Sequence, residues 1–136
     1  MKYTVLIISL VLIGCSQKPV HMQLGQKYDI ESSQSTLISL PSGSFVRAID
    51  EDQDGIKYTV AVKEDRVVFL STRSHIFECD GTKVGDRFYF DGEQVITRLP
   101  GWGCFYKCSE DGWYAATLCM QKSEHSKIEW FFKYNF

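Results

Sequence analysis

The spacing of short strand-like runs constrains this fold more than any other feature of the sequence. From Thr36 onward, runs rich in Val, Ile, Phe and Tyr are separated by turn residues at intervals of about 8–12 positions. The apolar positions show no 3.6-residue period after residue 14, so no amphipathic helix is expected there. The pattern predicts one all-β domain over residues 36–136, a small antiparallel β-sandwich or barrel.

Turn residues divide these runs into three predicted hairpins. Three runs also stand outside the hairpins. They are Thr36–Leu40, a weaker strand candidate that ends at Pro41, Arg66–Ser71, which is apolar enough for burial on both faces, and Lys127–Phe136, which alternates between large and polar side chains. The predicted hairpins are 45–49 with 56–63 around the turn 50–55, 87–90 with 94–98 around 91–93, and 103–108 with 113–120 around 109–112.

The amino terminus begins with a positive charge and a short apolar segment. Lys2 precedes the run Val5–Ile13, which is interrupted only by Ser9. A helix that spans a bilayer needs about 20 residues, so this run is too short for a membrane span. Its length suits the apolar core of an export signal.

The segment Leu12-Ile13-Gly14-Cys15 resembles the lipobox of bacterial lipoproteins, in which a small residue precedes an invariant cysteine. The resemblance implies that residues 1–14 are a cleaved signal peptide and that Cys15 carries diacylglycerol and a further acyl chain such as palmitate. Ser16, rather than Asp, follows the cysteine, which in this class favours the outer membrane over the inner membrane. Residues 15–35 are then expected to be the lipidated cysteine and a flexible tether.

Four cysteines remain once Cys15 is acylated, and an exported protein meets an oxidising compartment, so two disulfides are expected. Cys104 and Cys108 would lie about 13 Å apart along one strand, at roughly 3.3 Å per residue. A disulfide tolerates Cα separations of only about 4.4–6.8 Å, so a strand at Gly103–Cys108 excludes that pair.

The turn at Asp111-Gly112 decides between the two remaining pairings. A two-residue turn pairs Glu110 with Trp113 and, counted outward, places Cys104 opposite Cys119. Cys108 is then left for Cys79. The sequence therefore predicts Cys104–Cys119 and Cys79–Cys108, although a three-residue turn would shift the register by one and weaken the first assignment. Zinc ligation is the alternative, but the spacing lacks the paired C-x₂-C of zinc ribbons.

Two further patterns suggest binding sites. Asp50, Asp52 and Asp54 with Gly55 match the first half of a calcium loop, but Ala61 stands where the bidentate Glu should be. A solvated turn is therefore favoured, and a weak calcium site is the alternative.

The densest aromatic cluster surrounds the Pro100–Gly103 loop and gives the candidate binding residues, with a packed core as the alternative interpretation. They are Trp102, Phe105, Tyr106 and Trp113.

Charge and missing motifs narrow the function. The chain has 15 basic and 17 acidic residues, without the basic excess that nucleic-acid binding requires. No catalytic motif, metal-ligand spacing or phosphate-binding loop is present, so neither an enzyme nor a cofactor is expected. The sequence favours a lipid-anchored, periplasm-facing module that binds an envelope protein, as an inhibitor or immunity protein does. An envelope-maintenance lipoprotein without a tight soluble partner is the alternative, and an unrecognised enzyme comes third.

Overall fold

The computed structural model describes residues 22–30, 34–109, 111–119 and 124–136. The expected signal peptide at 1–14, Cys15 and the first part of the expected tether lie outside the described residues, as do Glu110 and Met120.

The described residues form eight strands in one antiparallel sheet and contain no helix, which confirms the all-β prediction. The strand order is β1-β2-β3-β4-β8-β7-β6-β5, so β8 lies in the middle of the sheet although it comes last in the chain. The strands are β1 (Thr36–Ser39), β2 (Phe45–Gln53), β3 (Ile56–Lys63), β4 (Arg66–Thr72), β5 (Thr97–Leu99), β6 (Gly103–Lys107), β7 (Trp113–Thr117) and β8 (Trp130–Tyr134).

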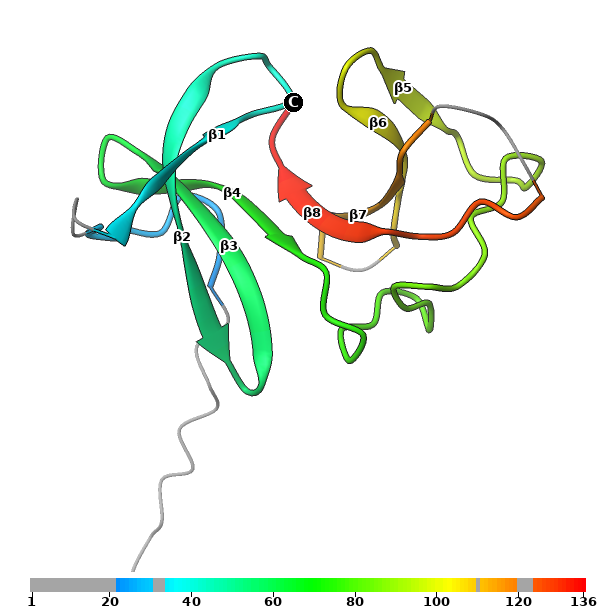
Figure 1. Cartoon of the computed structure of the whole chain (residues 1–136), viewed down its shortest axis with the longest axis horizontal. Coiled ribbons are helices and arrows are strands. Elements are labelled where there is room, and N and C mark those ends of the chain that lie inside the picture. The colour runs from blue at the N-terminus through cyan, green and yellow to red at the C-terminus, as the bar shows by residue number, and fades with distance from the viewer. Residues whose placement is uncertain (1–21, 31–33, 110, 120–123) are drawn as a thin grey trace, which may run out of the picture.

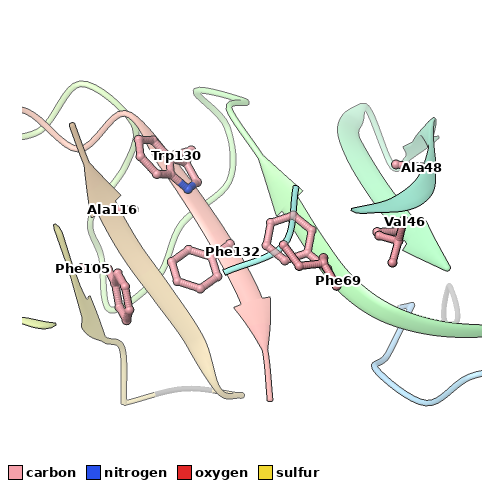
Figure 2. Close-up of a cluster of buried hydrophobic side chains, with 9 residues drawn as sticks. Val46, Ala48, Phe69, Phe105, Ala116, Trp130 and Phe132 are labelled. Atoms are coloured by element: carbon pink, nitrogen blue, oxygen red, sulfur yellow. The ribbon is translucent and has the colours of Figure 1, made fainter. Parts of the chain in front are cut away.

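The sheet is a single layer of strands that curves strongly, with β1–β4 on one side and β5–β8 on the other (Figure 1). Successive side chains alternate between its faces. The face that carries Phe69, Phe105 and Phe132, here called the inner face, gathers residues of β2, β3, β4, β6, β7 and β8 into one buried cluster. Phe132 lies at its centre, between Phe69 and Phe105 (Figure 2). One curved sheet therefore encloses this core without a second stacked sheet.

The opposite face, here called the outer face, is apolar as well and is covered by two segments that are not strands. Residues 22–30, the N-terminal cover, pack Met22, Leu24 and Tyr28 on a buried cluster of β3 and β4. Residues 73–96, the loop cover, pack over the outer face of β6, β7 and β8. The N-terminal cover falls within the range for which the sequence predicts a flexible tether, so the folded part of the chain extends further toward the amino terminus than predicted.

The hairpins follow the sequence prediction unevenly. The first hairpin forms between β2 and β3, but its turn is shorter than the predicted turn over 50–55. Strand β2 continues through Asp50–Gln53, and only Asp54 and Gly55 form the turn, at φ of 51° and 78°. The predicted hairpin of 87–90 with 94–98 is wrong: only Thr97–Leu99 is a strand, and it pairs with β6. The reason is that residues 87–96 are used to cover the outer face, where Arg87 bridges Lys127 and Phe88 is buried.

The third hairpin forms between β6 and β7, with a register two residues away from the predicted one. Cys104 lies opposite Thr117, and the Cys108 N–H donates to the Trp113 carbonyl, so four residues connect the strands instead of two. A shift by two keeps every side chain on its predicted face. Cys104 therefore still lies on the same face as Cys119.

Both predicted disulfides are confirmed. The Cα atoms of Cys79 and Cys108 are 6.2 Å apart, and those of Cys104 and Cys119 are 5.2 Å apart. The first bond fastens the loop cover to the end of β6, and the second fastens the segment after β7 to the start of β6. They close loops of 29 and 15 residues, for which the chain-entropy model gives stabilisation of about 3–4 kcal/mol each.

Gly103, at the start of β6, allows two strands and a tryptophan to approach closely. Its φ is 155°, and a Cβ atom there would lie 2.8 Å from the Thr117 carbonyl oxygen and 3.1 Å from the Trp130 ring. Neither neighbour is the free end of a flexible side chain, so a substitution must displace backbone or buried ring.

We predict that Gly103→Ala lowers the free energy of unfolding by about 2–3 kcal/mol, because overpacking adds to an unfavourable φ. Chemical denaturation measures this change. Gly92→Ala is the matched control, since its Cβ would meet mainly the amide oxygen at the flexible end of Gln94. Equal losses in the two variants would contradict the close approach at Gly103.

Candidate functional site

A pocket of about 550 Å³ lies on the outer face between the two covers. Its base is formed by outer-face residues of β3, β4, β7 and β8, and each cover contributes one side. We call it the outer pocket. It is lined by Met22, Gln23, Gln53, Ile56, Tyr58, Leu70, Ile76, Phe77, Glu78, Cys79, Asp111, Trp113 and Lys133.

Three half-buried aromatic rings line the outer pocket together. The centroids of Phe77 and Trp113 are 4.6 Å apart, and Tyr58 lies 6.2 Å from Trp113 and 6.3 Å from Phe77. Phe77 also packs on buried Phe131 at 5.1 Å, which ties the group to the core under the loop cover. Rings held by one another in this way are rigid, and each keeps part of its surface accessible.

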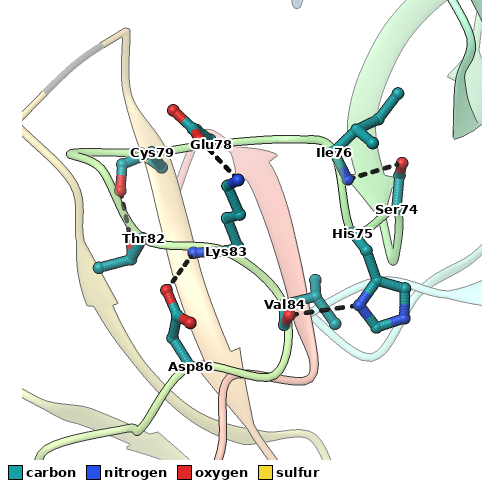
Figure 3. Close-up of polar contacts among 9 residues, drawn as sticks. All are labelled: Ser74, His75, Ile76, Glu78, Cys79, Thr82, Lys83, Val84 and Asp86. Carbon is teal, nitrogen blue, oxygen red and sulfur yellow. Dashed lines mark hydrogen bonds and ion pairs between the residues drawn. The ribbon is translucent and has the colours of Figure 1, made fainter.

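The loop cover is held in place by its own hydrogen bonds at the side of the pocket (Figure 3). The Thr82 hydroxyl donates to the Cys79 carbonyl at 2.6 Å, and the Lys83 N–H donates to the Asp86 carboxylate at 2.8 Å. The Lys83 ammonium pairs with Glu78 at 3.0 Å. A compact loop results, and the disulfide at Cys79 fixes it to the sheet.

A second attachment of the loop cover lies beside that disulfide. The Asp80 carboxylate accepts hydrogen bonds from the backbone N–H and the hydroxyl of Ser109, in the connection between β6 and β7. These bonds hold the pKa of Asp80 below its usual range. The same connection contains Asp111 and leads into Trp113, which both line the pocket. The loop cover is therefore joined to this part of the lining by a disulfide and by hydrogen bonds.

The N-terminal cover pairs with the beginning of β4 on the other side of the pocket. The Gly25 N–H donates to the Val67 carbonyl at 2.7 Å, and the Val67 N–H donates to the Gln26 carbonyl at 2.9 Å. The Tyr28 hydroxyl reaches across the sheet and donates to the Glu51 carboxylate on β2. Burial, this hydrogen bond and the negative charge of Glu51 together raise the pKa of Tyr28 to about 12.

Acidic groups outnumber basic groups around the outer pocket. Glu78 and Asp111 line it, and Glu51 lies directly across the strand pair from Tyr58. Burial raises the pKa of Tyr58, and the nearby negative charge of Asp54 raises it further. Lys133 is a basic group of the lining, and its stem lies against the turn at Gly112.

The structure divides the four aromatic residues that the sequence groups as a binding site between the two faces of the sheet: Trp102 and Phe105 contact each other in the inner cluster, and Tyr106 and Trp113 lie on the outer face. Phe105 and Tyr106 are 2% and 8% exposed and lie on opposite faces of β6, in the inner and outer clusters, so they belong to the core. Trp102 is half-buried, packs 4.5 Å from Phe132, and borders a smaller pocket of about 350 Å³ at the Pro100–Gly103 loop. Trp113 lines the outer pocket.

The three residues of the calcium alternative are divided between a strand and a turn. Asp50 and Asp52 lie in strand β2 and Asp54 in the turn, and the Asp50 carboxylate accepts a hydrogen bond from Thr59 and pairs with Lys57. Within the described part of the chain, no group of three or more His, Cys, Asp or Glu side chains converges as metal ligands.

Most residues of the outer pocket carry no local signal in the sequence. Tyr58 and Phe77 lie in segments predicted only as a strand and a connection, and Met22 and Gln23 lie in the predicted tether. Only the alternation of β3, which places Ile56 and Tyr58 on one face, could have grouped two of them.

The comparisons with known proteins add no family to this geometry. No protein-family model matches the chain, and searches of curated proteins and of solved structures return no match. Among the described residues, no helix is long and apolar enough to cross a bilayer.

We predict that alkaline pH releases the N-terminal cover before the rest of the domain. The folded-state pKa of Tyr28, about 12, exceeds its ordinary value of 10.0, so the stabilisation is complete below pH 10 and is lost as the pH rises toward 12. The absorbance of the wild type and of Tyr28→Phe is titrated with pH, and the second curve is subtracted from the first. The difference should show one tyrosine that ionises near pH 12. Glu51→Gln should lower that value, because the charged acceptor is removed. A difference curve centred near pH 10 would contradict the Tyr28–Glu51 bond.

Proposed function

We propose that this chain is a lipid-anchored binding module of the bacterial cell envelope, which holds a side chain of another envelope protein in the outer pocket. The observation that carries the proposal is the pocket itself, which is lined by three partly exposed rings and by several polar groups. Ligand sites generally combine an apolar base with a few polar groups that fix orientation. An inhibitor or immunity protein is the class that best fits such a site.

The two covers support the proposal because they hold the pocket open in advance. One is attached by the Cys79–Cys108 disulfide and by Asp80, and the other by backbone pairing with β4 and by Tyr28. A site that is already ordered loses little conformational entropy on binding, which favours affinity at a given contact area.

The position of the predicted anchor also supports the proposal. Met22 lines the pocket and stands seven residues after Cys15. Seven residues span at most about 25 Å when fully extended. A lipid on Cys15 would therefore keep the outer pocket close to the membrane surface, where a partner in the same envelope layer would meet it.

We predict that Cys15→Ser abolishes acylation and releases the protein from the membrane. Labelled palmitate should enter the wild-type chain and not the variant, and the variant should move to the soluble periplasmic fraction. Globomycin, which blocks the lipoprotein signal peptidase, should leave the wild-type precursor uncleaved. A Cys15→Ser chain that keeps both label and membrane fractionation would refute the anchor.

We predict that Ile76→Ser weakens capture of the partner at least several-fold, since Ile76 lies at the pocket rim and is 60% exposed, so its replacement leaves the core intact. Val95→Ser is the matched control, because Val95 is 86% exposed and lies outside the pocket. Cross-linking in envelope extracts followed by mass spectrometry measures the recovery. A partner recovered equally by both variants would exclude the outer pocket as the binding site.

A further inference from the structure

We propose that the outer pocket selects a cationic side chain, the arginine or lysine of a partner protein. This inference rests on the proposed function and names the chemistry that its site recognises.

The charges around the pocket favour a cation. Glu78 and Asp111 line it, Glu51 is paired across the strands with Tyr58, and Asp54 acts electrostatically on the Tyr58 hydroxyl. Among the charged residues of the lining itself, Glu78 and Asp111 are acidic and Lys133 is basic, and Lys83, outside the lining, pairs with Glu78. The excess of negative charge lies over a partly desolvated aromatic base, where a charge is screened less than in open water.

The aromatic base strengthens this preference. The faces of tyrosine, phenylalanine and tryptophan rings carry negative potential and attract a cation placed within about 6 Å of the ring centroid. Tyr58, Phe77 and Trp113 all line the pocket and lie within 6.3 Å of one another. One bound guanidinium or ammonium group could contact more than one of them.

The apolar residues at the rim match the rest of such a side chain. Arginine and lysine carry a hydrocarbon stem below the charged group, and that stem buries well against aliphatic surface. Met22, Ile56 and Ile76 supply that surface. A cation on an apolar stem therefore uses the rim, the rings and the carboxylates together, whereas a purely aliphatic side chain leaves the carboxylates unused.

The test compares a cation with its neutral counterpart of nearly the same shape. N-acetyl-arginine methylamide and N-acetyl-citrulline methylamide are titrated into the mature, disulfide-bonded domain labelled with nitrogen-15. The indole N–H signal of Trp113 reports the pocket, and those of Trp102 and Trp130 are internal controls in the inner cluster. We expect the arginine probe to shift the Trp113 signal and to bind about tenfold or more tightly than the citrulline probe.

Variants identify the groups responsible. Asp111→Asn and Glu78→Gln should each weaken arginine binding about three- to tenfold, and Lys133→Gln should strengthen it. Asn tolerates the left-handed backbone at position 111, where φ is 52°, so the fold is kept. Glu124→Gln, which removes the same charge from an exposed residue outside the pocket, should have no effect.

Equal binding of the two probes, no shift of Trp113 with either probe, or an equal effect of Glu124→Gln would overturn the cation preference. If any of these results accompanies partner loss in Ile76→Ser, the proposed function stands and the pocket takes an uncharged side chain. If arginine binds as expected but Ile76→Ser retains the partner, the cation site stands and the protein-binding function fails at this pocket.

Discussion

Both faces of the sheet are apolar, and the requirement to remove both from water shapes the rest of the molecule. A layer that is apolar on one side can pack against a single partner, but this one needs cover on two sides. Curvature solves the problem on the inner face, where Phe69, Phe105 and Phe132 of distant strands meet. On the outer face, two irregular segments perform the same task. The Cys79–Cys108 disulfide holds the loop cover, and backbone pairing with β4 holds the N-terminal cover.

The outer pocket is a consequence of covering one face with two separate segments. The N-terminal cover buries the outer side of β3 and β4, and the loop cover buries that of β6 to β8. Between the two covers, Tyr58 and Trp113 are only partly buried, although Phe77 of the loop cover packs against both. When a ligand displaces water from partly exposed rings, the burial of their apolar surface contributes favourably to the free energy of binding. Incomplete burial of these rings in the free domain therefore favours binding.

Side-chain alternation made the strands and disulfides predictable, and it also explains what was missed. The cysteine pairing survives a register error of two because such a shift preserves the face, as Cys104 and Cys119 illustrate. The pocket had no comparable signal. Its residues come from six parts of the chain, and segments such as Met22–Ile30 and Phe88–Ile96 adopt their positions through tertiary burial and not through a local period. The four aromatic residues are divided between the faces for a related reason, because Phe105 and Tyr106 are adjacent in sequence and therefore point to opposite faces.

The N-terminal cover links the architecture to the proposed location. A tether that ran freely to Thr36 would let the domain move over a wide volume above the membrane, since reach grows with the number of flexible residues. Backbone pairing of Gly25 and Gln26 with Val67 removes that freedom and leaves a short connection to Cys15. A shorter connection raises the effective concentration of the pocket for targets on the same surface and lowers it for targets farther away. The segment that completes the outer face would therefore also restrict which partners the pocket can reach, so selection by distance and selection by side-chain chemistry would act at one site.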